Sequence, residues 1–134
     1  MVPRGLRNHN PLNIKIGNDW QGERETKSDS VFEEFIADEW GYRAAFIILR
    51  KYIKKYHRNT IRMIVDAWAP DGFLKQLNYR RRVAAWTGRD ENAPISFEDK
   101  EFMVKMVQGM ARVENGCDIN PFPIYKGYEL ACGH

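Results

Sequence analysis

From residue 38 onward, apolar residues recur every three or four positions, the spacing of one face of an α-helix. The first such stretch runs from about residue 38 to about residue 56. Its apolar face consists of Ala44, Ala45, Ile48, Leu49, Tyr52, Ile53 and Tyr56. Asn59 or Thr60 can cap a second helix, which ends at Pro70 and Gly72. This period predicts a mainly α-helical protein.

Two further helices follow in the same pattern. One is predicted over about residues 74–86 and ends before Gly88. The other is predicted over residues 96–115, because Ser96 and Asp99 form a capping box at its start. Its apolar stripe is the longest in the chain and consists of Met103, Met106, Val107 and Met110. We therefore expect the 96–115 helix at the centre of the fold, with the 38–56 helix packed on it. The remainder, with Pro121 and Pro123, is predicted to be irregular.

The first thirty residues differ from the rest because they are polar and rich in Asn and Gly. Leu12, Ile14 and Ile16 alternate with polar neighbours, which is typical of a short strand. A second strand is predicted over residues 31–35. Together they predict a small N-terminal β-hairpin, so that the fold class is mainly α (α+β) in a single domain spanning residues 1–134.

Composition excludes several classes of protein. The 134 residues contain 43% hydrophobic and 29% charged side chains, as in ordinary globular domains. The absence of any 18-residue apolar run and a mean hydropathy of -0.59 argue against a membrane span. The N-terminus lacks the pattern of a signal peptide. We therefore expect a protein made in the cytoplasm, and if it acts elsewhere another component must carry it there. We also expect a monomer.

Cysteine and histidine are too few and too scattered for a metal site. Cys117 and Cys132 can either form one bridge or stay as two buried free thiols. His9, His57 and His134 lie far apart in the chain. We therefore expect no metal and no cofactor.

Glu114 is the residue with the clearest potential for chemistry. Helical spacing from Met103 places it on the apolar stripe of the 96–115 helix. Burial of a carboxylate as an ion is costly, so its pKa should be raised, as a general acid requires near neutral pH. The alternative is that Glu114 lies at a frayed helix end and simply reaches solvent.

Two polar clusters can bind ligands. Asn8, Asn10 and Asn13 offer paired donors and acceptors suited to sugar hydroxyl and acetamido groups, although they can equally satisfy their own turn. The run at residues 79–82 combines Tyr79 with three arginines. It can bind nucleic acid phosphates, but a solvated helix face is the simpler interpretation at a net charge of +3. We therefore do not expect a nucleic acid partner.

Several segments taken together resemble lysozyme-like peptidoglycan hydrolases. Residues 110–121 (MARVENGCDINP) resemble the end of the catalytic helix in that superfamily. Residues 7–14 (RNHNPLNI), followed by Trp20-Gln21-Gly22, resemble the Asn-rich and Trp-x-Gly pattern of phage and prophage lysins and of bacterial glucosaminidases. Phe35, residues 39–44 and residues 68–70 also resemble the phage-type group. The resemblance extends from Arg4 to about Tyr128.

This sequence departs from the family pattern at two places. The Glu helix follows the Asn-rich segment instead of preceding it, from which we infer a circular permutation of the lysozyme-like fold. After residue 70, the phage-type group usually continues with an acidic-Asn-Asn-Thr stretch, whereas this chain has residues 71–76 (DGFLKQ). The second departure puts substrate preference and activity in question.

The resemblance implies a muramidase, a glucosaminidase or a lytic transglycosylase that cuts the β-1,4 glycan strands of peptidoglycan. It also implies that the protein acts on the cell wall if a virion or a lysis system delivers it there. Glu114 would be the general acid, and Glu33 or Glu34 would be a second carboxylate, with at most one of the two facing the groove. The Asn-rich segment would lie across a cleft from Glu114. The aromatic candidates for lining that cleft are Trp20, Tyr42 and Tyr79. The alternative function is that of a non-catalytic structural or glycan-binding protein of a phage, which would associate with virion components.

Overall fold

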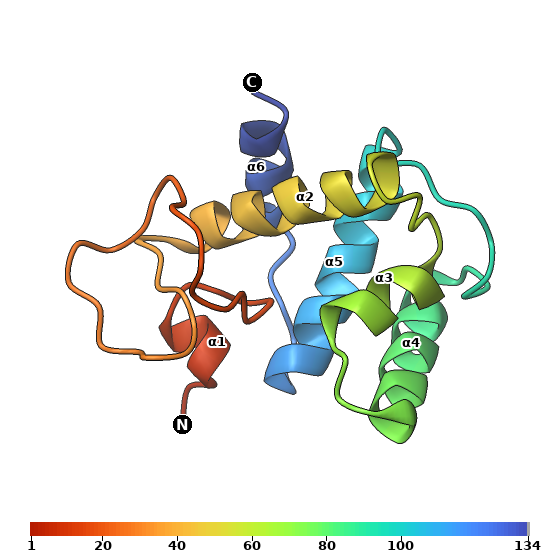
Figure 1. Cartoon of the computed structure of the whole chain (residues 1–134), viewed down its shortest axis with the longest axis horizontal. Coiled ribbons are helices and arrows are strands. Elements are labelled where there is room, and N and C mark those ends of the chain that lie inside the picture. Colours follow the sequence, from red (N-terminus) through yellow and green to blue (C-terminus); the bar gives the residue numbers. More distant parts are fainter. Residues whose placement is uncertain (134) are drawn as a thin grey trace.

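The protein is described by a computed structural model that covers residues 1–133. Within that range it is mainly helical, as predicted. It has six helices: α1 (Arg4–Arg7), α2 (Asp38–Lys54), α3 (Ile61–Trp68), α4 (Phe73–Thr87), α5 (Lys100–Asn115) and α6 (Phe122–Ala131). Figure 1 shows α2 crossing above α5, with α3 and α4 on one side and the irregular N-terminal segment on the other.

Side-chain caps are present at the starts of α3 and α5. The side chain of Thr60 accepts a hydrogen bond from the backbone N–H of Met63 (3.1 Å) at the start of α3. The predicted capping box of Ser96 and Asp99 is not formed, because Asp99 itself is the N-cap and accepts from the N–H of Phe102 (3.2 Å), so α5 begins at Lys100 and not at residue 96. Gly116 ends α5 in the left-handed conformation (φ 66°), which glycine adopts without strain. Apart from the start of α5, the predicted boundaries of α2 to α5 are close to those observed.

Helix α5 is the central buried helix, as predicted. Its stripe residues Met103, Met106, Val107 and Met110 are at most 1% exposed. It packs on α4, α6 and α1. This packing places the C-terminal end of α5, with Glu114, close to the N-terminal segment.

Helix α6 corrects two of the predictions. Residues 122–131 are helical and not irregular, because Pro123 lies in the first turn, where a missing N–H breaks no helical hydrogen bond. The helix also provides the main packing partner of α2, where we expected α5. Gly127 permits this close approach, since a Cβ there would lie 2.5 Å from the Cβ of Tyr42.

The predicted N-terminal hairpin is absent from the described residues. The two predicted strands meet in one isolated bridge, between Lys15 and Phe32, and a second bridge joins Glu23 of the connecting loop to Phe35. The buried Asn10 side chain bonds the backbone of Ile14 at both its N–H (3.0 Å) and its carbonyl (2.9 Å). Two backbone hydrogen bonds do join the segments, from the N–H of Ile16 to Val31 (2.9 Å) and from the N–H of Glu33 to Ile14 (2.9 Å). The Asn10 side chain then takes the Ile14 N–H and the Glu33 carbonyl (3.0 Å), which would form the next bond between strands, so the pairing stops there.

The other structural expectations concern cysteines, metals and membranes. Cys117 and Cys132 are both free, but Cys117 is exposed and Cys132 is only partly buried. Residues 1–133 contain no group of three or more His, Cys, Asp or Glu residues placed to hold a metal ion. No helix in this range has both the length and the apolar character needed to cross a membrane.

Candidate functional site

The carboxyl group of Glu114 lies in the last turn of α5, held between two neutral hydrogen-bond donors. The side-chain amide of Asn13 donates to one oxygen (2.9 Å), and the hydroxyl of Tyr79 on α4 donates to the other (3.0 Å). Asn13 is 101 positions away in the sequence. The predicted closeness of the Asn-rich segment and Glu114 is therefore confirmed for Asn13.

Burial raises the pKa of Glu114 above its ordinary value. The hydrogen bonds from Asn13 and Tyr79 favour the ionised form and offset part of this effect, while the negative charge of Asp71 adds to it. The pKa of Tyr79 is also raised well above its ordinary value, first by burial and then by the charge of Glu114. Tyr79 therefore keeps its proton, and Glu114 is placed to hold one.

Three surface cavities share wall residues near this carboxyl group, and two of them include Glu114 itself. We call the three together the Glu114 groove. Two cavities of about 260 and 280 Å³ share Ala69, Asp71 and Glu114 in their walls. A third, of about 330 Å³, continues from Asn13 and Trp68 toward Ile48 and Tyr52. The carboxyl of Glu114 is therefore accessible from two sides in a groove long enough for an extended ligand.

Trp68 is the main aromatic residue of the groove, and the prediction of groove residues omitted it. It lines two of the cavities at the end of α3. Its ring nitrogen donates to the carbonyl of Leu12 (3.0 Å), and Tyr52 packs edge-on against it at 6.2 Å. Because flat apolar rings pack well on sugar faces, Trp68 suits a glycan. The sequence signal that could have identified Trp68 as a groove residue is its position beside Ala69 and Pro70, where α3 ends.

The three candidate asparagines separate into one groove residue and two structural residues. Asn13 has a left-handed backbone (φ 54°), which Asn tolerates, and its side chain lies at Glu114. Asn8 is buried and donates to Asp29 (3.0 Å). Asn10 is fully buried and binds backbone groups. Asn8 and Asn10 therefore shape the segment that presents Asn13.

Two of the three aromatic candidates lie away from the groove. Tyr42 is 1% exposed in the core between α2 and α6. Trp20 packs against the core from the N-terminal segment, and its backbone N–H donates to Glu23 (2.5 Å). Tyr79 lines the groove, as predicted.

Glu33 and Glu34 are both buried in the N-terminal segment, so the expectation that one of them faces the groove is not met. Glu34 accepts hydrogen bonds from Arg24 (3.1 Å) and from the backbone N–H groups of Ser28 (2.7 Å) and Asp29 (3.0 Å). These donors lower its pKa. Glu33 pairs with Lys27 (3.1 Å), and burial raises its pKa. Both carboxyls stabilise the irregular segment.

Asp71 is the carboxylate that the groove does contain. It is exposed, it lines both cavities beside Glu114, and its charge acts on the pKa of Glu114. The sequence offered a signal for it, because Asp71 begins the stretch that departs from the phage-type pattern. The site therefore combines one partly buried carboxyl with one solvated carboxylate.

Comparison with known proteins identifies a phage relative. No protein-family model matches the chain. The chain is 41% identical over 133 residues to Protein P5 of Pseudoalteromonas phage PM2, and the match covers 94% of this chain and 80% of the relative. The chain therefore belongs to the family of this phage protein.

Proposed function

We propose that this protein cleaves the glycan strands of peptidoglycan, with Glu114 as the general acid. The observation that carries the proposal is the Glu114 carboxyl, held by Asn13 and Tyr79 at the point where two cavities meet. A carboxyl with a raised pKa and two open sides can protonate the leaving oxygen of a glycosidic bond. The resemblance of the sequence to lysozyme-like peptidoglycan hydrolases supports the same role.

Two reaction types use such an acid. In hydrolysis, a second carboxylate acts as nucleophile or activates a water molecule, and we assign that role to Asp71 because it lines the same two cavities. In lytic transglycosylation, the substrate supplies the nucleophile and one Glu is sufficient. Delivery to the wall by a phage particle or a lysis system is part of the proposal.

Purified sacculi provide the test. The parent protein should release soluble muropeptides, and Glu114→Gln should lower the rate by a factor of about 10² to 10⁴, the usual contribution of acid–base catalysis. Glu25→Gln is the matched control, because Glu25 is exposed outside the groove. New reducing ends would indicate hydrolysis, and anhydro-muropeptides would indicate transglycosylation. Digestion by Glu114→Gln at the parent rate would overturn the role of Glu114.

The second candidate is a non-catalytic structural or glycan-binding protein of a phage particle. The similarity to Protein P5 of a phage favours a connection with phage particles. In that case the protein would bind sacculi in the same groove and leave them intact. Co-sedimentation with sacculi, without release of muropeptides by the parent protein, would replace the first proposal with this one.

A further inference from the structure

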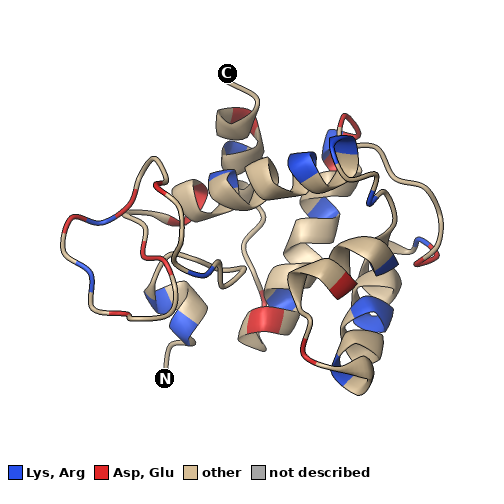
Figure 2. Ribbon diagram, in the orientation of Figure 1, with Lys and Arg blue, Asp and Glu red and all other residues tan. Residues whose placement is uncertain are grey.

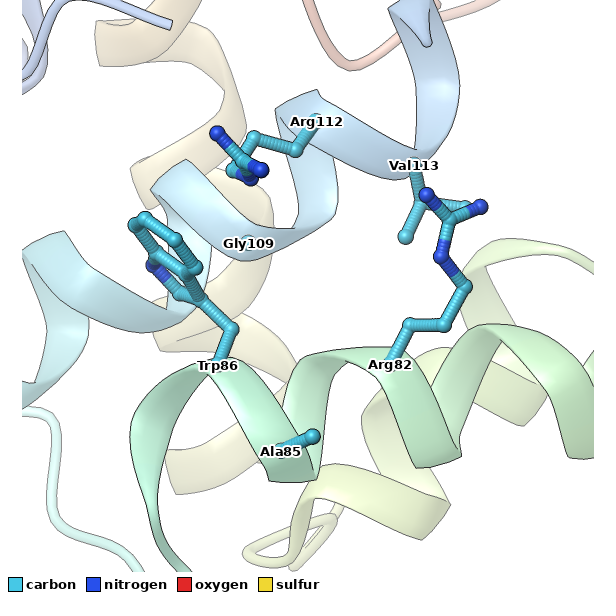
Figure 3. Close-up of a pocket in the computed structure, with 6 residues that line it drawn as sticks. All are labelled: Arg82, Ala85, Trp86, Gly109, Arg112 and Val113. Carbon is cyan, nitrogen blue, oxygen red and sulfur yellow. The ribbon is translucent and has the colours of Figure 1, made fainter. Parts of the chain in front are cut away.

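A basic cavity opens between α4 and α5, directly beside the Glu114 groove. It has a volume of about 310 Å³ and is lined by Arg82, Ala85, Trp86, Gly109, Arg112 and Val113. Figure 3 shows Arg82 extending from α4 and Arg112 from α5, with the Trp86 ring beside Gly109. We call it the Arg82–Arg112 cavity.

Shared side chains connect this cavity to the groove. Arg82 and Val113 also line the 260 Å³ cavity that contains Glu114. Arg82 and Arg112 line a further cavity of about 300 Å³ around the loop that follows α5. A ligand in the groove can therefore extend a branch past Arg82 into the basic cavity.

The two guanidinium groups have different surroundings. Arg82 is exposed, and its guanidinium group has no ion pair or hydrogen bond with any residue from 1 to 133. Arg112 stacks over the Trp86 ring (4.3 Å to its centroid) and pairs with Asp118, an almost fully exposed side chain. Stacking on Trp86 holds Arg112 in place, while Arg82 is free to bind an anion.

The walls of the cavity indicate what kind of anion fits. Guanidinium groups bind planar carboxylates through paired hydrogen bonds. Between the arginines, Ala85, Val113 and the Trp86 ring provide apolar surface. A short peptide with small apolar side chains and free carboxylates matches both properties.

Nucleic acid fits the arrangement less well. Arg80 is buried and pairs with Glu91 (2.8 Å) and Asp66 (3.4 Å), so it is not available to a phosphate. Basic residues of α4 and the acidic residue near the end of α5 are visible in Figure 2. Of the exposed arginines of α4, Arg82 lines the groove and the basic cavity, whereas Arg81 lines neither. The helix therefore does not present a continuous row of free arginines along which a phosphate backbone could lie.

We infer that the Arg82–Arg112 cavity binds a free carboxylate of the stem peptide that peptidoglycan carries beside its glycan bonds. This inference rests on the proposed substrate of the Glu114 groove. It extends that proposal because it predicts that the protein recognises the peptide as well as the glycan.

The test compares two forms of purified sacculi, both stripped of anionic wall polymers. One form, the complete one, keeps the free carboxylates of its stem peptides, and in the other form these carboxylates have been converted to neutral amides. Removal of the peptides by an amidase would instead leave a new free carboxylate on each muramic acid. Binding is measured by co-sedimentation in the Glu114→Gln background, so that the polymer stays intact. The protein should bind the complete form about tenfold more tightly, which is the contribution expected of one charge-assisted hydrogen-bonded contact.

Arg82→Gln should abolish that preference, and Arg112→Gln should weaken it. Arg81→Gln is the matched control, because Arg81 is exposed on the same helix and lies outside the cavity. Arg112 also packs on Trp86, so Arg112→Gln can disturb folding. If it does, the result for Arg82→Gln alone decides the test, because Arg82 is exposed. Equal binding to both forms, equal effects of Arg82→Gln and Arg81→Gln, or a stronger preference for double-stranded DNA would overturn the inference.

The outcome is separable from that of the proposed function. Carboxylate-dependent binding that Arg82→Gln removes, without any cleavage by the parent protein, would support the cavity and reject catalysis. Cleavage of both forms at equal rates, with binding insensitive to Arg82, would support catalysis and reject the cavity.

Discussion

Glu34 in the N-terminal segment and Glu114 in the groove are both withdrawn from solvent, but their surroundings favour opposite protonation states. Glu34 receives two backbone N–H groups and the Arg24 guanidinium, and its pKa is lowered. Glu114 receives two neutral side-chain donors and faces the negative charge of Asp71, and its pKa is raised. The N-terminal segment therefore uses its carboxylate as a structural anion, whereas the groove holds a carboxyl that can release a proton.

Glu33 shows that burial and a neighbouring cation do not together decide whether the pKa of a carboxyl is raised or lowered. It is adjacent to Glu34, it is fully buried, and it pairs with Lys27, yet its pKa is raised by burial and by the neighbouring Glu23. The difference is the set of donors, because Glu34 binds backbone N–H groups that are fixed in place. Hydrogen-bond donors that are fixed in place therefore decide, more than exposure does, whether a buried carboxyl has a lowered pKa and stays ionised or has a raised pKa and can hold a proton.

The largest expected effect on stability is that of Glu34→Gln. The oxygen of a Gln side chain can accept from the two backbone N–H groups, but its NH2 group then faces the Arg24 guanidinium. Arg24 therefore loses its buried anionic partner. The free energy of unfolding should fall by about 3 kcal/mol, the low end for a broken buried pair, because Arg24 is itself partly exposed. Urea unfolding measures this change.

Glu33→Gln is the control, because Glu33 is adjacent and equally buried. It should cost clearly less, or stabilise, because the folded state disfavours its ionised form. Equal losses of unfolding free energy in the two variants would contradict the difference in protonation inferred for Glu33 and Glu34.

Tyr79→Phe should have a smaller effect. It removes the hydroxyl that donates to Glu114 (3.0 Å) and should lower the free energy of unfolding by about 1 kcal/mol. Because this hydrogen bond lowers the pKa of Glu114, its loss should shift the titration of Glu114 to higher pH. The pH dependence of muropeptide release should move in the same direction.

Tyr128→Phe is the matched control for Tyr79→Phe. Its hydroxyl donates to the carbonyl of Phe97 (2.8 Å), away from the groove. A similar loss of stability without any shift of the pH profile is expected. A shift of equal size in both variants would contradict a specific role of Tyr79 at Glu114.

The smallest expected effect is a pH-dependent gain from Glu114→Gln. Below the ordinary Glu pKa of 4.5, both the folded and the unfolded parent protein keep this proton. As the pH rises above 4.5, the unfolded carboxyl ionises first, so the parent loses stability relative to the variant until the pKa of folded Glu114 is passed. Thermal unfolding at pH 4 and pH 8 should show a larger advantage of the variant at pH 8, and a constant difference would contradict the raised pKa.

Sequence periodicity predicted α2 to α5 well, because the apolar face and the caps of each helix are local signals. Helix α6 was missed because two prolines outweighed its packing on α2, a tertiary contact that depends on Gly127. The predicted hairpin is reduced to isolated bridges because the Asn10 side chain binds the Ile14 N–H and the Glu33 carbonyl, which would otherwise bond to each other in a continued strand pair.

The residues of the site also differ in whether a local sequence signal or a tertiary contact determines their position. Glu114 lies on a helical stripe, so its position could be derived from spacing, and the resemblance pointed to Asn13. Asp71 and Trp68 reach the groove only through the turn between α3 and α4, whose course depends on tertiary packing. Glu33 and Glu34 could not be assigned from alternation, because their segment is not a strand.

We expect Glu114 to keep its proton at a pH where an ordinary Glu has lost it, and Glu34 to be ionised there. Side-chain carboxyl NMR of the isotope-labelled protein measures both groups in one titration, with Glu114→Gln and Glu34→Gln assigning the two signals. We expect the signal of Glu114 to titrate above pH 4.5 and that of Glu34 below it. Coincident titrations, or Glu114 titrating below Glu34, would contradict the account.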